Sequence, residues 1–191
     1  GFSPAMFQGE SNIEDSGALT AQEAGQRAVE LYKNVPQLQN AHVSLQNASE
    51  TGSGVYKVNL DIQAGNQSRN FPLYVSKDGV LLFPQNVKIE ESNSEKISAE
   101  EAGRIAKEEM EKILSKDPRV NQTTVKFINS SGIENGLYAL NIEVTAQGRT
   151  QRLKSFITTD GKFLFIRAAN ITAQLNQIEQ LKKQASPNLQ N

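Results

Sequence analysis

The chain has 191 residues, and its 20 Lys and Arg nearly balance its 21 Asp and Glu, giving a net charge of −1. This balance argues against a nucleic-acid partner, because such partners normally require a basic face. Cysteine is absent and His42 is the single histidine, which excludes thiol chemistry, disulfides and cysteine-based metal sites within these residues.

The N-terminal stretch, residues 1–17, is polar and contains no apolar run long enough for a signal peptide or a membrane segment. We predict that it forms a flexible leader. The chain does not begin with Met, so we keep open the expectation of a membrane tether upstream of residue 1.

The sequence then repeats itself. Leu19–Ala28 returns as Ile97–Ala106, a displacement of 78 positions, and the triplet at 54–56 (Gly-Val-Tyr) returns at 136–138 (Gly-Leu-Tyr), a displacement of 82. This pattern predicts an internal duplication, with repeat 1 at 18–91 and repeat 2 at 92–170. At roughly 75 residues each repeat is close to the lower limit for an independent core, so we expect each to be marginal alone.

Each repeat is predicted to open with an amphipathic helix. Thr20 with Glu23, and Ser98 with Glu101, have the spacing of a capping box. Apolar residues follow at spacings of three and four, which is the period of a helix with one buried face.

Two glycines, Gly25 and Gly103, recur inside these predicted helices, where each costs about 1 kcal/mol relative to Ala. We interpret them as points where the helix approaches the sheet too closely for a Cβ.

Apolar and polar residues then alternate, as in 56–62 and 138–144, which predicts strands. Asp78-Gly79 and Asp160-Gly161 separate apolar runs and predict hairpins with type I′ turns. Pro72 indicates an edge strand. The predicted fold class is therefore α+β, with two tandem repeats in which one helix packs on an antiparallel sheet of about four strands.

The last segment, 171–191, departs from the repeat and predicts a C-terminal helix followed by a linker. Its apolar residues form a narrow stripe at spacings of four and three. Docking on repeat 2 is the first interpretation. A self-associating helix and a spacer remain the alternatives.

No pattern identifies a catalytic residue, a cofactor-binding residue or a metal ligand. His42 is interpreted as a solvent-facing strand residue without companion ligands. The acidic residues at 108–111 are interpreted as a solvated helix face, with Glu108 paired to Lys112. Asp78 and Asp160 lack the alternating oxygen ligands of a calcium loop and are assigned to turn chemistry.

The recurring aromatic residues have two interpretations. Core or sheet-face packing is the favoured one. The alternative is a peptide-binding surface beside an exposed strand edge, which would accept an extended chain by strand addition. The residues proposed for that surface are Tyr56, Tyr74, Tyr138 and Phe156.

The chain contains five Asn-x-Ser/Thr triplets, beginning at residues 47, 66, 121, 129 and 170. This is a mild excess that an Asn-rich chain can produce, and it hints at an extracytoplasmic setting.

The segment 73–84 (LYVSKDGVLLFP) resembles the small α+β modules that precede the thioredoxin-like domain of some DsbA-family disulfide oxidoreductases. The chain is similar, more loosely, to the cystatin-like dimerisation domain of periplasmic disulfide isomerases. It also resembles PepSY domains in its helix-then-strands order and its Tyr-x-Val strand. These resemblances imply an extracytoplasmic, non-catalytic module. No Cys-x-x-Cys motif is present, so no catalytic residue is carried over.

From these observations we expect a non-catalytic extracytoplasmic binding or assembly module, an accessory region of a thiol-disulfide oxidoreductase or a similar exported protein. The alternative is a PepSY-like inhibitor or chaperone of a secreted peptidase, and a hydrolase is a distant third class. The expected partner is a protein or peptide, with a homodimer left open, and no cofactor is implied.

Overall fold

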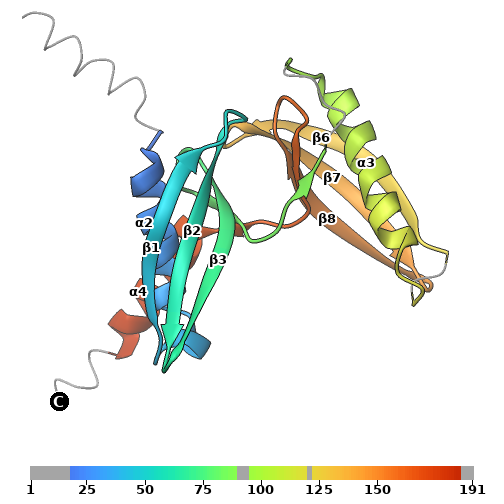
Figure 1. The fold of residues 1–191 in the computed structure, drawn as a ribbon. Coiled ribbons are helices and arrows are strands. Elements are labelled where there is room, and N and C mark those ends of the chain that lie inside the picture. Colours follow the sequence, from blue (N-terminus) through green and yellow to red (C-terminus); the bar gives the residue numbers. More distant parts are fainter. Residues whose placement is uncertain (1–17, 90–94, 120–121, 186–191) are drawn as a thin grey trace, which may run out of the picture.

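The computed structural model describes residues 18–89, 95–119 and 122–185. The predicted leader at 1–17 and linker at 186–191 lie outside these ranges. Within them the fold is α+β, with three α-helices and two antiparallel sheets of five strands each (Figure 1). We call residues 18–89 the first half and residues 95–170 the second half.

The two halves present their elements in the same order, a helix followed by five strands. The first half contains α2 (Ala21–Lys33), a short 3-10 helix (Pro36–Leu38), β1 (His42–Glu50), β2 (Val55–Ala64), β3 (Gln67–Ser76), β4 (Leu81–Phe83) and β5 (Val87–Lys88). The second half contains α3 (Ala99–Ser115), β6 (Thr124–Glu134), β7 (Leu137–Ala146), β8 (Arg149–Ile157), β9 (Phe163–Phe165) and β10 (Ala169–Asn170), and α4 (Ile171–Ala185) follows.

Helices α2 and α3 both begin at the predicted caps. The Thr20 hydroxyl accepts from the Glu23 amide at 3.1 Å, and the Glu23 carboxylate accepts from the Thr20 amide at 2.9 Å, which completes the capping box. In the second half the Ser98 hydroxyl accepts from the Glu101 amide at 3.1 Å, but the Glu101 carboxylate pairs with Arg104. The second capping box is therefore half formed.

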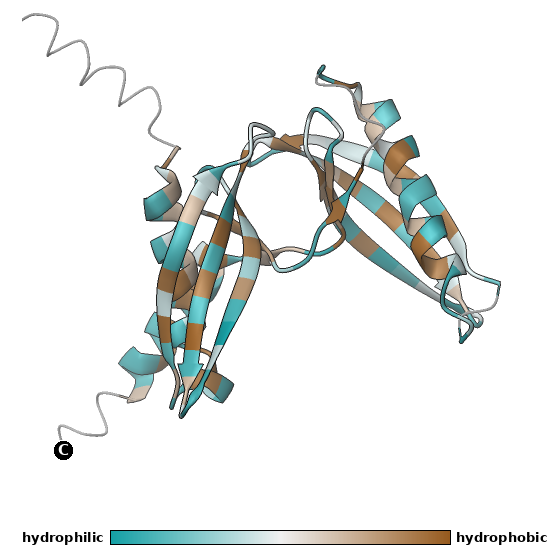
Figure 2. Cartoon of the chain, in the orientation of Figure 1, coloured by the Kyte–Doolittle hydropathy of each residue, from teal (hydrophilic) through white to brown (hydrophobic). Residues whose placement is uncertain are grey.

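The long strands alternate as predicted, and Figure 2 shows the resulting bands of apolar and polar residues. In β2 the side chains of Val58 and Leu60 are fully buried against α2, and in β7 Leu140 is fully buried and Ile142 almost so, both against α3. Each sheet thus has a helix side and a helix-free face. In Figure 1 α2 and α4 lie on the outer side of one sheet and α3 on the outer side of the other.

The glycines sit where the predicted close approach occurs. A Cβ at Gly25 would lie 2.8 Å from a Leu45 methyl carbon, and a Cβ at Gly103 would lie 2.3 Å from the Phe127 ring. The absence of a side chain therefore sets how closely each helix packs on the first strand after it.

The shortest strands are exchanged between the halves, which the sequence analysis did not predict. The sheet orders are β1-β2-β3-β4-β10 and β5-β9-β8-β7-β6, so each sheet takes one strand from the other half. The Ile89 amide donates to the Lys162 carbonyl at 2.8 Å, and the Ile171 amide donates to the Val80 carbonyl at 2.6 Å. Positions 89 and 171, like 80 and 162, are 82 apart, so the exchange is reciprocal.

The C-terminal helix α4 packs on the first half, so the prediction that it docks on repeat 2 is wrong. Ile171 is fully buried in the first-half core, and Leu175 and Ile178 pack against it. Arg27 of α2 fixes the position of α4, since its guanidinium donates to the Gly79 carbonyl at 2.8 Å and to the Thr172 hydroxyl at 2.7 Å. Strand β10 carries the chain across to the first sheet, and α4 begins there.

The hairpins at Asp78 and Asp160 form, but their turns are not type I′. That type requires positive φ at both central residues, whereas the positive φ falls on the following Gly79 and Gly161, both at 73°. The Asp78 carboxylate accepts from the Ser76 hydroxyl at 2.6 Å and from the Val80 amide at 3.0 Å. The aspartates therefore serve the turn through their side chains, as turn chemistry predicts.

Strand β3 is interior in the sheet order, yet it is paired only with β2 at Pro72. Strand β4 covers only Tyr74 and Val75. The prediction that Pro72 marks an edge strand is therefore wrong. Proline is tolerated in this interior strand because its missing amide faces the side where no strand is paired.

Candidate binding surface

The structure buries three of the four aromatic residues that were proposed for a binding surface. Tyr56 and Tyr138 are each 6% exposed, and Phe156 is 4% exposed. The Tyr56 hydroxyl donates to the Leu19 carbonyl at 2.5 Å, and the Tyr138 hydroxyl donates to the Ile97 carbonyl at 2.6 Å. The packing interpretation describes these rings, and they do not form an accessible peptide-binding surface.

Tyr74 is half-buried at the junction of the two halves, beside rings from the second half. Its ring centroid lies 5.4 Å from that of Phe163 and 5.5 Å from that of Phe165. Phe83 of the first half stacks on Phe165 at 4.1 Å and lies 5.7 Å from Phe156. We call these five rings the junction cluster. Their packing continues through Val55, Leu81, Leu137 and Ala139, so the helix-free faces of the two sheets meet on an apolar contact.

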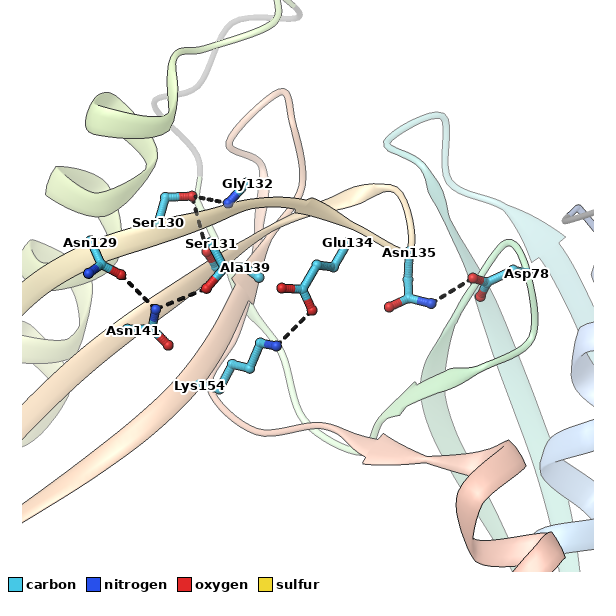
Figure 3. A network of polar contacts seen from close by, with 10 residues as sticks. All are labelled: Asp78, Asn129, Ser130, Ser131, Gly132, Glu134, Asn135, Ala139, Asn141 and Lys154. Carbon is cyan, nitrogen blue, oxygen red and sulfur yellow. Dashed lines mark hydrogen bonds and ion pairs between the residues drawn. The ribbon is translucent and has the colours of Figure 1, made fainter.

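Next to the junction cluster, the helix-free face of the second sheet carries a hydrogen-bonded network, shown in Figure 3. The Asn141 side-chain amide donates to Asn129 Oδ1 at 2.7 Å and to the Ser131 hydroxyl at 2.9 Å. The Ser130 hydroxyl donates to the Ala139 carbonyl at 3.1 Å. These contacts tie β6 to β7 at two bulges, between 127 and 129 and between 130 and 132.

The first half has the same pair at the corresponding place. The Asn59 side-chain amide donates to Asn47 Oδ1 at 2.6 Å beside the bulge in β1. Positions 47 and 129, like 59 and 141, are 82 apart. A polar pair on the helix-free face is thus present in both sheets.

Ion pairs and one bond between the halves surround the second-sheet network. Lys154 donates to the Glu134 carboxylate at 2.7 Å, and its ammonium lies 5.9 Å from the Phe156 ring centroid. The Asn135 side chain donates to the Asp78 carboxylate at 2.7 Å, as Figure 3 shows. This last bond joins the β6–β7 turn to the β3–β4 turn across the junction.

A hollow of about 320 Å³ opens on this face between Ile128, Asn141, Arg152 and Lys154. Arg152 pairs with Glu143 at 3.4 Å across the neighbouring strand. The hollow is therefore lined by amide groups, by the apolar Ile128 side chain and by two cationic side chains that each pair with a glutamate. Such a surface suits the backbone and carboxylate groups of a peptide.

The outer strands of the two sheets are poorly suited to strand addition. β1 and β6 are edge strands, and the ladder of each is interrupted by bulges. Bulges of this kind protect edges from pairing with another chain. The helix-free faces are therefore better candidates than the exposed edges of β1 and β6.

The remaining candidates of the sequence analysis lie on the surface, away from the junction. His42 is exposed at the start of β1. Glu108 pairs with Arg104 at 2.9 Å, not with Lys112, while the predicted solvated face is confirmed. A hydrogen bond from Arg104 lowers the pKa of Glu101. Within the described ranges, no group of three or more His, Asp or Glu could hold a metal ion.

Comparisons with family models, curated proteins and solved structures find no match for this chain. None of the helices in the described ranges is both long and apolar enough to cross a membrane. The family resemblance therefore rests on the motifs of the sequence.

Sequence reasoning missed the Asn network, Arg27 and the exchanged strands. A signal for the network was present, because Asn47 and Asn59 recur as Asn129 and Asn141 at the same displacement of 82 as the Gly-x-Tyr triplets. The exchanged strands are two residues long, too short to show alternation.

Proposed function

We propose that this chain is a non-catalytic, extracytoplasmic binding or assembly module, an accessory region of a thiol-disulfide oxidoreductase or of a similar exported protein. The observation that carries the proposal is the polar network and hollow on the helix-free face of the second sheet, beside an apolar junction. Groups in that position are available to an unfolded polypeptide, which offers backbone donors and acceptors as well as apolar side chains.

We further propose that the two halves are tandem repeats of a PepSY-like or cystatin-like unit. The support is a set of paired features, displaced by 78 positions in the helices and by 82 in the strands. Each half has a tyrosine bonded to the residue before the helix cap, and each has a helix glycine against the first strand. Each also has an Asn pair at a bulge. Three polar and steric details that recur at these two displacements favour common descent over chance.

The junction cluster supports an assembly role, because it fixes the second-sheet face relative to the first. The bond between Asn135 and Asp78 also crosses the junction. A surface held on a rigid element loses little conformational entropy when a ligand binds.

The test uses reduced and alkylated ribonuclease A as an unfolded probe, titrated into the isotope-labelled chain and followed by backbone amide shifts. We expect shifts to gather on β6–β8 around Asn141. The double change Asn129→Ala and Asn141→Ala should weaken binding by about tenfold, from the loss of roughly one charged or two neutral hydrogen bonds. The matched control is Asn47→Ala with Asn59→Ala, which should leave binding unchanged.

Shifts confined to the first half, or none at all, would contradict the proposed surface. The alternative function is a PepSY-like regulator of a secreted peptidase. Inhibition of a peptidase encoded beside this chain, without binding of the unfolded probe, would favour that alternative. The extracytoplasmic assignment is tested separately by fusing the native gene, with its upstream region, to an alkaline phosphatase reporter, which is active only outside the cytoplasm.

A further inference from the structure

The helix side of the second half contains a groove that has no partner among the described residues. It has a volume of about 520 Å³ and lies between the two chain segments that cross between the halves and the last turn of α3. Its apolar lining includes Val87, Leu164 and Ile166, together with Ile113 of α3, which is 39% exposed. Arg167 stands exposed at its rim.

The corresponding place in the first half is occupied by α4. A displacement of 82 relates Leu164 to Leu82 and Val87 to Ala169, and the pairings of these residues match: Ala169 with Leu82, and Val87 with Leu164. Leu82 and Ala169 belong to the cluster against which Leu175 and Ile178 of α4 pack. The groove in the second half is therefore the counterpart of the surface on which α4 docks in the first half. We call each of these two surfaces a helix seat.

One residue distinguishes the two seats. Arg27 anchors α4 through Thr172, and the residue 78 positions later, at the matching place in α3, is Ile105. Ile105 packs into the second-half core and cannot donate such a bond. Within the described ranges, α3 is the single helix on this side of the second sheet. No second helix of the described residues fills this seat, which leaves it available to a helix from another molecule.

We propose that this groove binds an amphipathic helix of a partner protein. Its apolar side chains would be spaced by four and three residues, as in Ile171, Leu175 and Ile178 of α4, because α4 shows the kind of helix that a seat of this shape accepts. Arg167 makes no ion pair within the described ranges, so a carboxylate on the partner helix would complement it.

This helix seat and the proposed polypeptide-binding face lie on opposite sides of the second sheet. Leu164 belongs to the helix-side core, whereas Asn141 alternates with the buried Leu140 and Ile142. The helix seat therefore stands independently of the proposed function, and each is tested with its own probe and variants.

The probe is a fluorescein-labelled peptide with the sequence of residues 171–185, titrated with the full chain and followed by anisotropy. We expect saturable binding with one peptide per chain. Ile113→Glu should weaken it at least tenfold, because a carboxylate would enter the apolar wall, and Arg167→Glu should weaken it by a few fold. Ile133→Glu is the matched control, since Ile133 is 50% exposed on β6 and lies outside the groove, and it should bind as the parent does.

Four outcomes would overturn the proposal. The first is equal peptide binding by the parent and by Ile113→Glu. The second is binding that appears only after Arg27→Ala, which would place the peptide in the seat of α4. The third is binding that appears only after residues 1–17 are removed, which would make the chain itself the occupant. A concentration-dependent dimer in sedimentation that is lost in Ile113→Glu would identify a second copy as the occupant and would equally overturn it.

Discussion

The two halves of this chain share a strand register, a cap, a glycine contact and a tyrosine bond, yet they differ in what covers the helix side of each sheet. The first half carries α2 and α4, held together by Arg27, whereas the second carries the longer α3 and an open groove. Local sequence thus determines the helices and strands, which are alike in the two halves. The halves differ at one matching helix position: Arg27 holds α4 on the first half, whereas Ile105 of α3 packs into the second-half core.

The halves nevertheless depend on each other. Each sheet takes its fifth strand from the other half, and the junction cluster is made of rings from both. Units of this size bury little apolar surface alone, so the shared strands and rings supply burial that neither half has by itself.

The largest expected effect is at the junction. Phe165 is fully buried and stacked on Phe83, so Phe165→Ala should lower the free energy of unfolding by about 3–5 kcal/mol. Urea denaturation followed by circular dichroism measures this loss. Phe71→Ala is the control, because Phe71 is 38% exposed. A loss below about 1 kcal/mol at Phe165 would mean that the halves do not rely on this contact.

The helix glycines give a matched pair between the halves. In Gly103→Ala the new methyl meets the rigid Phe127 ring at 2.3 Å, and we expect a loss of about 1–3 kcal/mol from overpacking. In Gly25→Ala it meets the mobile end of Leu45 at 2.8 Å. There the gain in helix propensity, about 1 kcal/mol, should offset the strain. Thermal unfolding of both variants measures the two changes in stability. Equal losses of stability would contradict this difference between the halves.

Replacing Arg27 tests which contacts hold α4 on the first half. Arg27→Ala removes the bonds to the Gly79 carbonyl and the Thr172 hydroxyl, which should destabilise the docking of α4 by about 1–3 kcal/mol. Hydrogen exchange should then rise in α4 while the amides of α3 keep their protection. Ile105→Ala is the counterpart in the second half and should leave α4 protected. Unchanged exchange in α4 after Arg27→Ala would show that its apolar stripe suffices.

The smallest expected effect concerns Tyr56. Burial, with a contribution from Glu50, raises its pKa above the ordinary 10.0. The folded state therefore holds the proton more tightly, so this stabilisation is complete below pH 10.0 and is lost as the pH rises through the folded-state value. Tyr56→Phe, which lacks the bond to Leu19, should cost about 1 kcal/mol at neutral pH. It should also flatten the fall of stability above pH 10, measured by urea denaturation from pH 8 to 11. An unchanged slope would contradict this account.

Much of the fold could be predicted from the sequence because its signals are local. The caps at Thr20 and Ser98, the alternation in β2 and β7 and the role of Gly103 depend on neighbours along the chain or on one contact. The partner of β5 could not be predicted, since its two residues pair equally well with either half by local criteria. The position of α4 could not be predicted for a related reason. Helix α4 directly follows β10, and the sheet that β10 joins could not be predicted either.

The candidate site was less predictable than the fold. Tyr56 and Tyr138 were proposed for a binding surface because they are large and recur. Their rings are buried, because each hydroxyl bonds the residue before a helix cap and so joins the helix to its sheet. Asn129 and Asn141 belong to no catalytic motif, and only their recurrence from Asn47 and Asn59 distinguishes them in the sequence.

The reciprocal strand exchange is tested most directly by engineered disulfides, because the parent chain contains no cysteine. Lys88 lies opposite Phe163 in the exchanged pairing, and the matching partner without exchange would be Leu81, 82 positions before 163. We predict that Lys88→Cys with Phe163→Cys forms an intramolecular disulfide under mild oxidation, detected by mass spectrometry of the proteolytic fragments. Formation of the disulfide between Lys88→Cys and Leu81→Cys instead would contradict the exchange.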